Sequence, residues 1–128
     1  MRIIASDADI AEGLDHLVRR DRRLRKIMRV AGPVPLRRRP GGFEGLARIV
    51  VGQQVSTASA EAIWGRFVAA FPGCSVEAIH TASDEALRAP GLSTPKIRTL
   101  RAAAAACRDG LDLTALASLP AEEAHRRL

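Results

Sequence analysis

Residues 43–71 place the strongest limit on the architecture, because two apolar helical patterns flank a short polar segment there. The apolar residues recur at intervals of three and four, which places them on one face of a helix. They are Phe43, Leu46, Ala47 and Val50 in the first pattern and Ile63, Phe67 and Phe71, beside Trp64, in the second. The stretch therefore predicts two amphipathic helices that pack against each other as an αα-hairpin.

The polar segment between the two helices, residues 52–57, forms the turn of this hairpin, which we call the elbow. Gly52 weakens the end of the first helix by about 1 kcal/mol relative to alanine. Ser56 or Thr57 is suited to cap the second helix, because a hydroxyl oxygen accepts a bond from its free N–H groups. Two amide side chains, Gln53 and Gln54, are thereby predicted near the tip of the hairpin.

The rest of the chain is also patterned as helices, and aromatic residues make up only 3% of it. We expect helices at residues 7–20, 21–31, 75–82, 83–90 and 94–108, with caps at Ser6 or Asp7, Asp21, Ser83 and Thr94 and a stop at Gly110. A last helix begins at Pro120 and shows no stop signal at Leu128, so we expect the chain to end inside a helix. The prediction is an all-α bundle of about six to eight helices, forming a single domain over residues 1–128.

The balance of charge is basic, with a formal net charge of +6 and a pI of about 10.9. Net positive charge favours polyanions, because each neutralised phosphate releases counterions. An arginine-rich but ordinary solvated surface is the alternative, and the charge alone does not decide between them. The basic face of helix 21–31 and the run Arg37-Arg38-Arg39 are open to both interpretations, and we favour solvated surface for each.

Several classes of site find no support in the residues. Cys74 and Cys107 have no metal-ligand spacing, and Cys107 falls on an apolar helical face. The histidines at positions 16, 80 and 125 have no partner at metal or catalytic-triad spacing. No apolar run approaches the roughly 20 residues that span a bilayer, and no secretory signal is present. We expect a reduced, cytoplasmic protein with no metal or other cofactor, whose oligomeric state the residues leave open.

Four segments in order resemble one protein family. Residues 43–56 read FEGLARIVVGQQVS, residues 87–93 read LRAPGLS, Lys96 follows, and residues 119–124 read LPAEEA. Together they are similar to the DNA-3-methyladenine glycosylase II type of helix-hairpin-helix DNA glycosylases. The resemblance implies an all-α fold and a hydrolase that removes alkylated bases from double-stranded DNA in base excision repair, without a metal or redox cofactor.

The resemblance also implies roles for the elbow residues. Gln54 corresponds to the wedge, the residue that fills the space left by an extruded nucleotide. Gln53 corresponds to the amide residue before the wedge, and Ser56 to a residue that contacts the minor groove. The alternative is that both glutamines only close the helix, which we favour for Gln53, whereas we favour the wedge for Gln54. Basic residues near the start of helix 94–108 could meet a phosphate, with Lys96 as the candidate contact, but we favour a solvated face for all three of them: Lys96, Arg98 and Arg101. Trp64 sits at core spacing, so we favour packing over base stacking.

No catalytic residue is assigned. The family uses an aspartate that follows its helix-hairpin-helix motif, and no aspartate in this chain has that context. We therefore expect residues 1–128 to be the N-terminal portion of a glycosylase and to be inactive alone. The alternative belongs to another class: a non-enzymatic basic helical module for DNA binding or protein interaction, complete at 128 residues.

Overall fold

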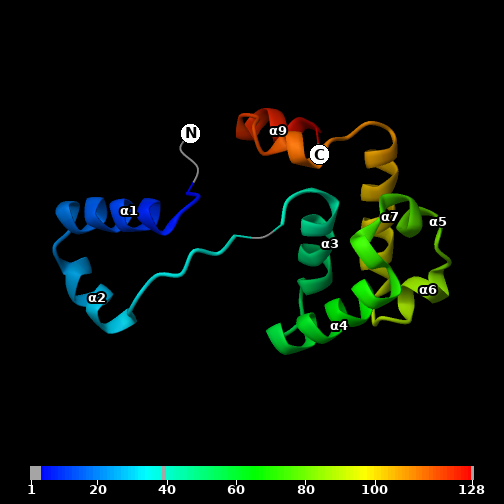
Figure 1. Cartoon of the computed structure of the whole chain (residues 1–128), viewed down its shortest axis with the longest axis horizontal. Helices are drawn as coiled ribbons and strands as arrows, with labels where there is room; N and C mark the ends of the chain where they lie inside the picture. Colours follow the sequence, from blue (N-terminus) through cyan, green and yellow to red (C-terminus); the bar gives the residue numbers. More distant parts are fainter. Residues whose placement is uncertain (1–3, 39, 128) are drawn as a thin grey trace. The chain divides into compact units, whose positions relative to one another are not determined.

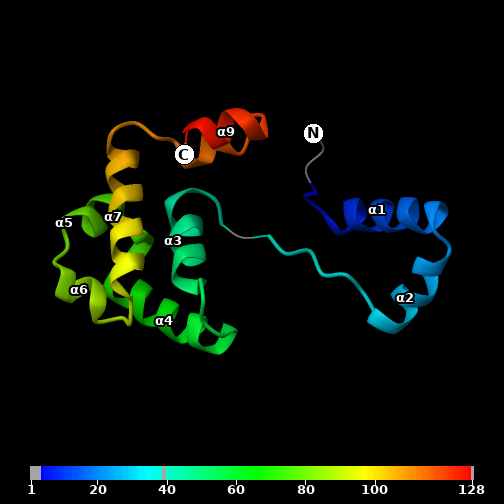
Figure 2. The same cartoon turned by 180° about the vertical axis from the view of Figure 1, so that it is seen from behind.

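The computed structural model describes residues 4–38 and 40–127, and these residues form helices and connecting segments without a strand (Figures 1 and 2). Nine α-helices and one 3-10 helix lie in this part of the chain, and six of the α-helices have seven or more residues. The predicted all-α class is confirmed. Contacts within the chain separate two compact units, Met1–Arg39 and Pro40–Leu128, which are described in turn. That all 128 residues form one domain stays a prediction.

The first unit contains α1 (Asp7–Arg20) and α2 (Arg23–Ala31). Ser6 is the N-cap of α1: its hydroxyl accepts from the Asp9 N–H while the Asp9 carboxylate accepts from the Ser6 N–H. Asp21 was predicted to cap α2, but the cap position is Arg22. The Asp21 carboxylate instead accepts from the backbone and the guanidinium of Arg23, and these bonds lower the pKa of Asp21.

The apolar stripes of α1 and α2 meet over a small area only. Ile10, Leu14, Val18, Leu24 and Met28 are half-buried, and no described residue of this unit is buried. Ile27 shares the helical spacing of Leu24 and Met28, yet its side chain is 59% exposed. Two short helices cannot enclose a full apolar face, which needs a further packed element.

The second unit is a helical bundle in which α3 and α7 lie side by side, α4 runs across one end of both, and α5 and α6 lie on the far side of α7 from α3 (Figures 1 and 2). Its elements are α3 (Gly42–Gly52), α4 (Thr57–Ala70), a 3-10 helix (Pro72–Cys74), α5 (Val76–Thr81), α6 (Asp84–Arg88), α7 (Thr94–Arg108), α8 (Leu113–Leu116) and α9 (Ala121–Arg127). The predicted αα-hairpin is the α3–α4 pair.

The core of this unit lies between α3, α4, α5, α6 and α7, each of which contributes buried side chains. Its largest fully buried side chains are Phe67, Ile79, Leu87, Leu100 and Val51. The Phe67 ring stacks on Trp64 at 5.6 Å between centroids and meets Phe71 at 5.3 Å. Trp64 is 8% exposed, which confirms that it packs in the core. The three aromatic rings come from one helical face, as their spacing of three and four residues indicates.

Element boundaries differ from the predictions at three places. Thr94 was predicted to cap α7, but Ser93 holds the extended cap conformation (φ −76°, ψ 157°), so that Pro95 occupies the second helical position. The short helix α8 was not predicted, although the Asp112 carboxylate caps it by accepting from two backbone N–H groups. The predicted stop holds: α7 ends at Arg108, and Gly110 follows with a φ of 104°. Arg39 and Leu128, which the predictions also used, lie outside the described residues.

The buried thiol of Cys74 gives this unit a dependence on alkaline pH. Burial, with a smaller contribution from the Glu44 carboxylate, raises the pKa of Cys74 from 9.0 to about 11. The folded chain therefore holds this proton more tightly than the unfolded chain, so the stabilisation is complete below about pH 9 and is lost as the pH rises towards 11. We expect the free energy of unfolding to fall by on the order of 2 kcal/mol between about pH 8 and pH 11, measured by urea denaturation.

The matched controls for this prediction are Cys74→Ala and Cys107→Ala. Cys107 is only partly buried, although burial and Asp112 raise its pKa as well. Because the chain has no tyrosine, few other groups titrate in this range. Cys74→Ala should flatten the pH curve far more than Cys107→Ala, and an equally steep curve in Cys74→Ala would show that another group is responsible.

Candidate nucleic-acid interface

The α3–α4 hairpin is held together by contacts between its two helices. The Arg48 guanidinium on α3 donates to both carboxylate oxygens of Glu61 on α4 at 2.9 Å and lies 5.5 Å from the centre of the Trp64 ring. Nearer the elbow the helices come close: a Cβ added at Gly52 would lie 3.8 Å from the Cβ of Ala60. These contacts make the hairpin a stiff support for the residues at its tip.

Gln54 occupies the exposed turn of the elbow in an unusual backbone conformation. Its φ is 55°, in the left-handed region that residues with a Cβ adopt at a cost of roughly 1–2 kcal/mol. The side chain is exposed and forms no hydrogen bond with the described part of the chain. The fold therefore holds a strained residue at its surface without using its amide internally. Strained backbone conformations cluster at active sites and ligand-binding sites, which makes Gln54 a candidate binding residue.

Gln53 and Ser56 take part in the helix ends on either side of Gln54. Gln53 is the C-cap of α3, with its backbone N–H donating to the Val50 carbonyl at 3.3 Å. Ser56, not Thr57, caps α4: its hydroxyl accepts from the Ser59 N–H at 3.2 Å and donates to the Ser59 hydroxyl at 3.0 Å. Both side chains are exposed. A contact of either residue with DNA stays a prediction.

Lys96 lies at the base of the elbow, in the first turn of α7. Its ammonium nitrogen donates to the backbone carbonyl of Val51 at 2.7 Å, across 45 residues of chain. This bond was not predicted, because nothing in the local sequence around either residue indicates that α3 and α7 are neighbours. The candidate phosphate contact at Lys96 stays a prediction, made for a side chain that is half-buried and already bonded.

The other two basic residues at the start of α7 have different surroundings. Arg101 donates to the carbonyls of His80 and Ala82 at 3.0 and 2.6 Å and to the Asp84 carboxylate at 2.8 Å, so it fastens the α5–α6 connection to α7. Arg98 is exposed and forms no hydrogen bond within the described chain. Of these cations, Arg98 is the one whose charge is fully available at the surface.

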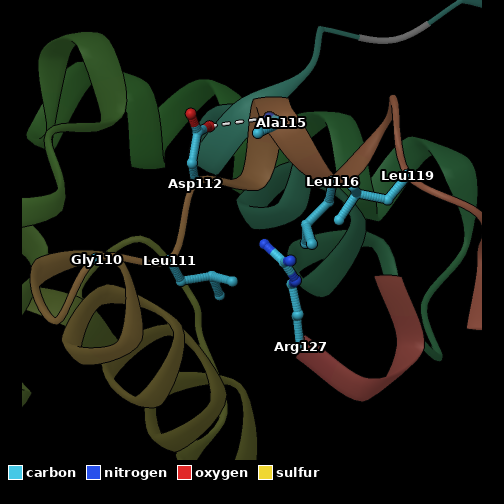
Figure 3. A pocket seen from close by; sticks show the side chains of 7 residues that line it. All are labelled: Gly110, Leu111, Asp112, Ala115, Leu116, Leu119 and Arg127. Atoms are coloured by element: carbon cyan, nitrogen blue, oxygen red, sulfur yellow. Dashed lines mark hydrogen bonds between the residues drawn. The ribbon is translucent and has the colours of Figure 1, made fainter. Parts of the chain in front are cut away.

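A pocket of about 250 Å³ lies near the junction of α7, α8 and α9 (Figure 3). Figure 3 shows the Arg127 guanidinium directed between the side chains of Leu111 and Leu116, with the Asp112 carboxylate bonded to the Ala115 N–H. None of the predicted site residues lines this pocket. Its walls are mainly leucine and alanine, and the carboxylate at its edge serves as a helix cap, so the pocket offers no free acid or base.

The aspartates of the second unit are engaged in the fold or exposed at its surface. Asp84 accepts from Arg101, Asp112 caps α8, and Asp109 is exposed at the end of α7. Within residues 4–38 and 40–127, no cluster of three or more His, Cys, Asp or Glu side chains is arranged to hold a metal ion. Among the helices described, none has the length and apolar character needed to cross a bilayer.

Three comparisons with known proteins bear on this site. The family model for HhH-GPD superfamily base excision DNA repair proteins matches residues 47–127, which include the elbow and α7. A solved structure of DNA-3-methyladenine glycosidase from Bacillus halodurans is similar to the chain, with a TM-score of 0.71 and 33% sequence identity. The match covers 100% of this chain and 59% of the glycosidase, so the chain spans little more than half of that protein. Comparison with curated proteins gives no match.

Proposed function

Because the chain belongs to the HhH-GPD superfamily of base excision DNA repair proteins, we propose that it forms the duplex-opening part of a DNA glycosylase that removes alkylated bases of the 3-methyladenine type. Two findings support the proposal: the likeness to a DNA-3-methyladenine glycosidase, and the exposed, strained Gln54 at the tip of a stiff hairpin. The partner is double-stranded DNA that carries a damaged base. The proposed mechanism rests on the conformation of Gln54, because that observation concerns a residue of this chain.

An enzyme that acts on a base inside a duplex must first extrude the nucleotide, which costs a few kcal/mol of stacking and pairing. A side chain that enters the vacated space recovers part of this cost and keeps the duplex bent. Gln54 suits this task, because the helices on both sides fix its backbone and its amide has no partner within the described chain. Its amide is both donor and acceptor, so it can bond to the base left unpaired on the opposite strand.

The hydrolytic step requires a carboxylate near the extruded nucleotide, and we assign no such residue. Asp84 forms an ion pair with Arg101, and Asp112 serves as a helix cap beside a leucine-lined pocket. We propose that the described residues contribute opening of the duplex, and that this chain alone does not release the base. Base release by residues 1–128 at the rate of an intact glycosylase would contradict this assignment.

Gln54→Ala tests the wedge directly. We expect the variant to bind a duplex that contains an abasic-site analogue about tenfold or more weakly than the wild type, because a lost stabilisation of about 1.4 kcal/mol is a factor of ten. Binding to an undamaged duplex of the same sequence should be nearly unchanged, since phosphate contacts dominate there. Fluorescence anisotropy of labelled duplexes at fixed salt measures both affinities.

Gln53→Ala is the matched control, since Gln53 is the neighbouring exposed amide but has an extended backbone (φ −63°, ψ 136°). It should lose less affinity for the abasic duplex than Gln54→Ala. Equal affinity of wild type and Gln54→Ala for the abasic duplex would contradict the wedge. If both duplexes also bound alike and only salt changed the affinity, the alternative of a non-enzymatic basic module would be supported.

A further inference from the structure

The carbonyl of Val51 lies in the last turn of α3, just before the elbow. The last four carbonyls of a helix have no donor within the helix, and unpaired polar groups at a buried position are costly. The Val50 carbonyl is satisfied by the Gln53 N–H, and the Val51 carbonyl by the Lys96 ammonium at 2.7 Å. A cation at this end of a helix also interacts favourably with the helix dipole. Lys96 thus caps α3 from a different helix.

We propose that Lys96 is a positioning residue for Gln54, acting through the Val51 carbonyl; this rests on the proposed role of Gln54 as the wedge. Val51 is fully buried, and exposure begins two residues later, at Gln53. The Lys96 bond is therefore made at the last point where the chain is anchored in the core. The bond fixes the direction in which the backbone leaves α3. It thereby fixes the position of Gln54, the residue with positive φ at the tip of the hairpin.

The geometry separates this role from a direct phosphate contact. Lys96 is half-buried, and its ammonium is occupied by a carbonyl of the elbow's own helix. Arg98, two residues further along the same helix, is exposed and has no hydrogen bond within the described chain. A phosphate contact at Lys96 would lower affinity for every duplex when removed, as at Arg98. A positioning role lowers it only where Gln54 has a vacated space to fill.

The test is a double-mutant cycle on DNA binding with Lys96→Met, which keeps the length of the side chain but has no donor. Lys96→Met should weaken binding to the abasic duplex about five- to tenfold and leave the undamaged duplex within about twofold. In a Gln54→Ala background the same substitution should have little further effect, because coupled residues are not additive. Arg98→Met, the matched control, should weaken both duplexes alike.

The outcomes separate the two proposals. If Gln54→Ala weakens abasic binding and Lys96→Met does not, the wedge stands and the positioning role is wrong. A loss that is equal on both duplexes and persists in the Gln54→Ala background makes Lys96 a phosphate contact and also overturns the positioning role. If Gln54→Ala has no effect, the proposed function fails instead.

Hydrogen exchange in the protein without DNA tests the positioning independently of the proposed function. In Lys96→Met the backbone amide of Gln53, which donates to the Val50 carbonyl at the end of α3, should exchange about tenfold faster, while amides of α5 keep their wild-type rates. If Lys96→Met does not fold, Lys96→Gln, which has a shorter and uncharged side chain, is compared with Arg98→Met. Exchange of the Gln53 amide in Lys96→Gln that is several times faster than in Arg98→Met is expected from loss of the Lys96 bond, and equal exchange in the two variants overturns the proposal.

Discussion

Replacing Phe67 with alanine is expected to lower the free energy of unfolding of the second unit by about 3–5 kcal/mol. Phe67 is fully buried and contacts both other aromatic rings of the core, so the substitution leaves a cavity among side chains that cannot close over it. Small domains have a total stability of only about 5–15 kcal/mol, so a large share of the margin is lost. Urea denaturation followed by the fluorescence of the single tryptophan measures the change.

Val55→Ala is the control for this substitution. Val55 is also apolar, but it lies in the elbow and is 39% exposed, so little buried area is lost. We expect it to change stability by less than about 1 kcal/mol. A Phe67→Ala variant that lost no more than Val55→Ala would mean that the aromatic stack is not the centre of the core.

Most features that depend on neighbours within one helical turn were predicted correctly, although the caps of α2 and α7 were each placed one residue too early or too late and α8 was missed. The hairpin follows from apolar residues at intervals of three and four, and Phe67 and Trp64 are buried as that spacing indicates. Caps such as Ser83 and Ser56 satisfy backbone groups within three residues. These interactions are local, so the chain order itself places the partners side by side.

Features that depend on long-range contacts were not predictable from the residues. Lys96 bonds to Val51 across 45 residues, and Arg101 bonds to Ala82 across 19. Both were considered as phosphate contacts because a basic residue near a helix start has the same appearance whether it meets a ligand or a carbonyl of its own chain. The packing of α7 on α3 and α5, which decides between these roles, is a property of the fold.

The burial of an apolar stripe depends on what packs against it. The stripe of α3 is buried, because α4 and α7 both contact that helix. The stripe of α2 has the same spacing, yet Ile27 is exposed, because within its unit only α1 is available to cover it. Periodicity therefore predicts which face of a helix is apolar, and the number of neighbouring helices decides how far that face is buried.

Replacing Gln54 with glycine is expected to have opposite effects on stability and on binding. Glycine adopts positive φ without steric cost, so relief of the strain at a φ of 55° should raise the free energy of unfolding by about 0.5–1 kcal/mol after the extra entropy of the unfolded chain is counted. The same change removes the side chain, so binding to an abasic duplex should weaken about tenfold or more. Urea denaturation and anisotropy on the same preparations measure the two quantities.

Gln54→Ala separates the two effects, because alanine keeps the backbone strain and loses the side chain. It should bind the abasic duplex as weakly as Gln54→Gly but have a stability close to that of the wild type. A Gln54→Gly variant that was no more stable than Gln54→Ala would show that the left-handed conformation carries no strain. A more stable glycine variant with wild-type binding would show that the strain has no connection with DNA. Only the combination of higher stability and weaker binding indicates that the fold maintains a costly conformation at Gln54 because the side chain is needed there.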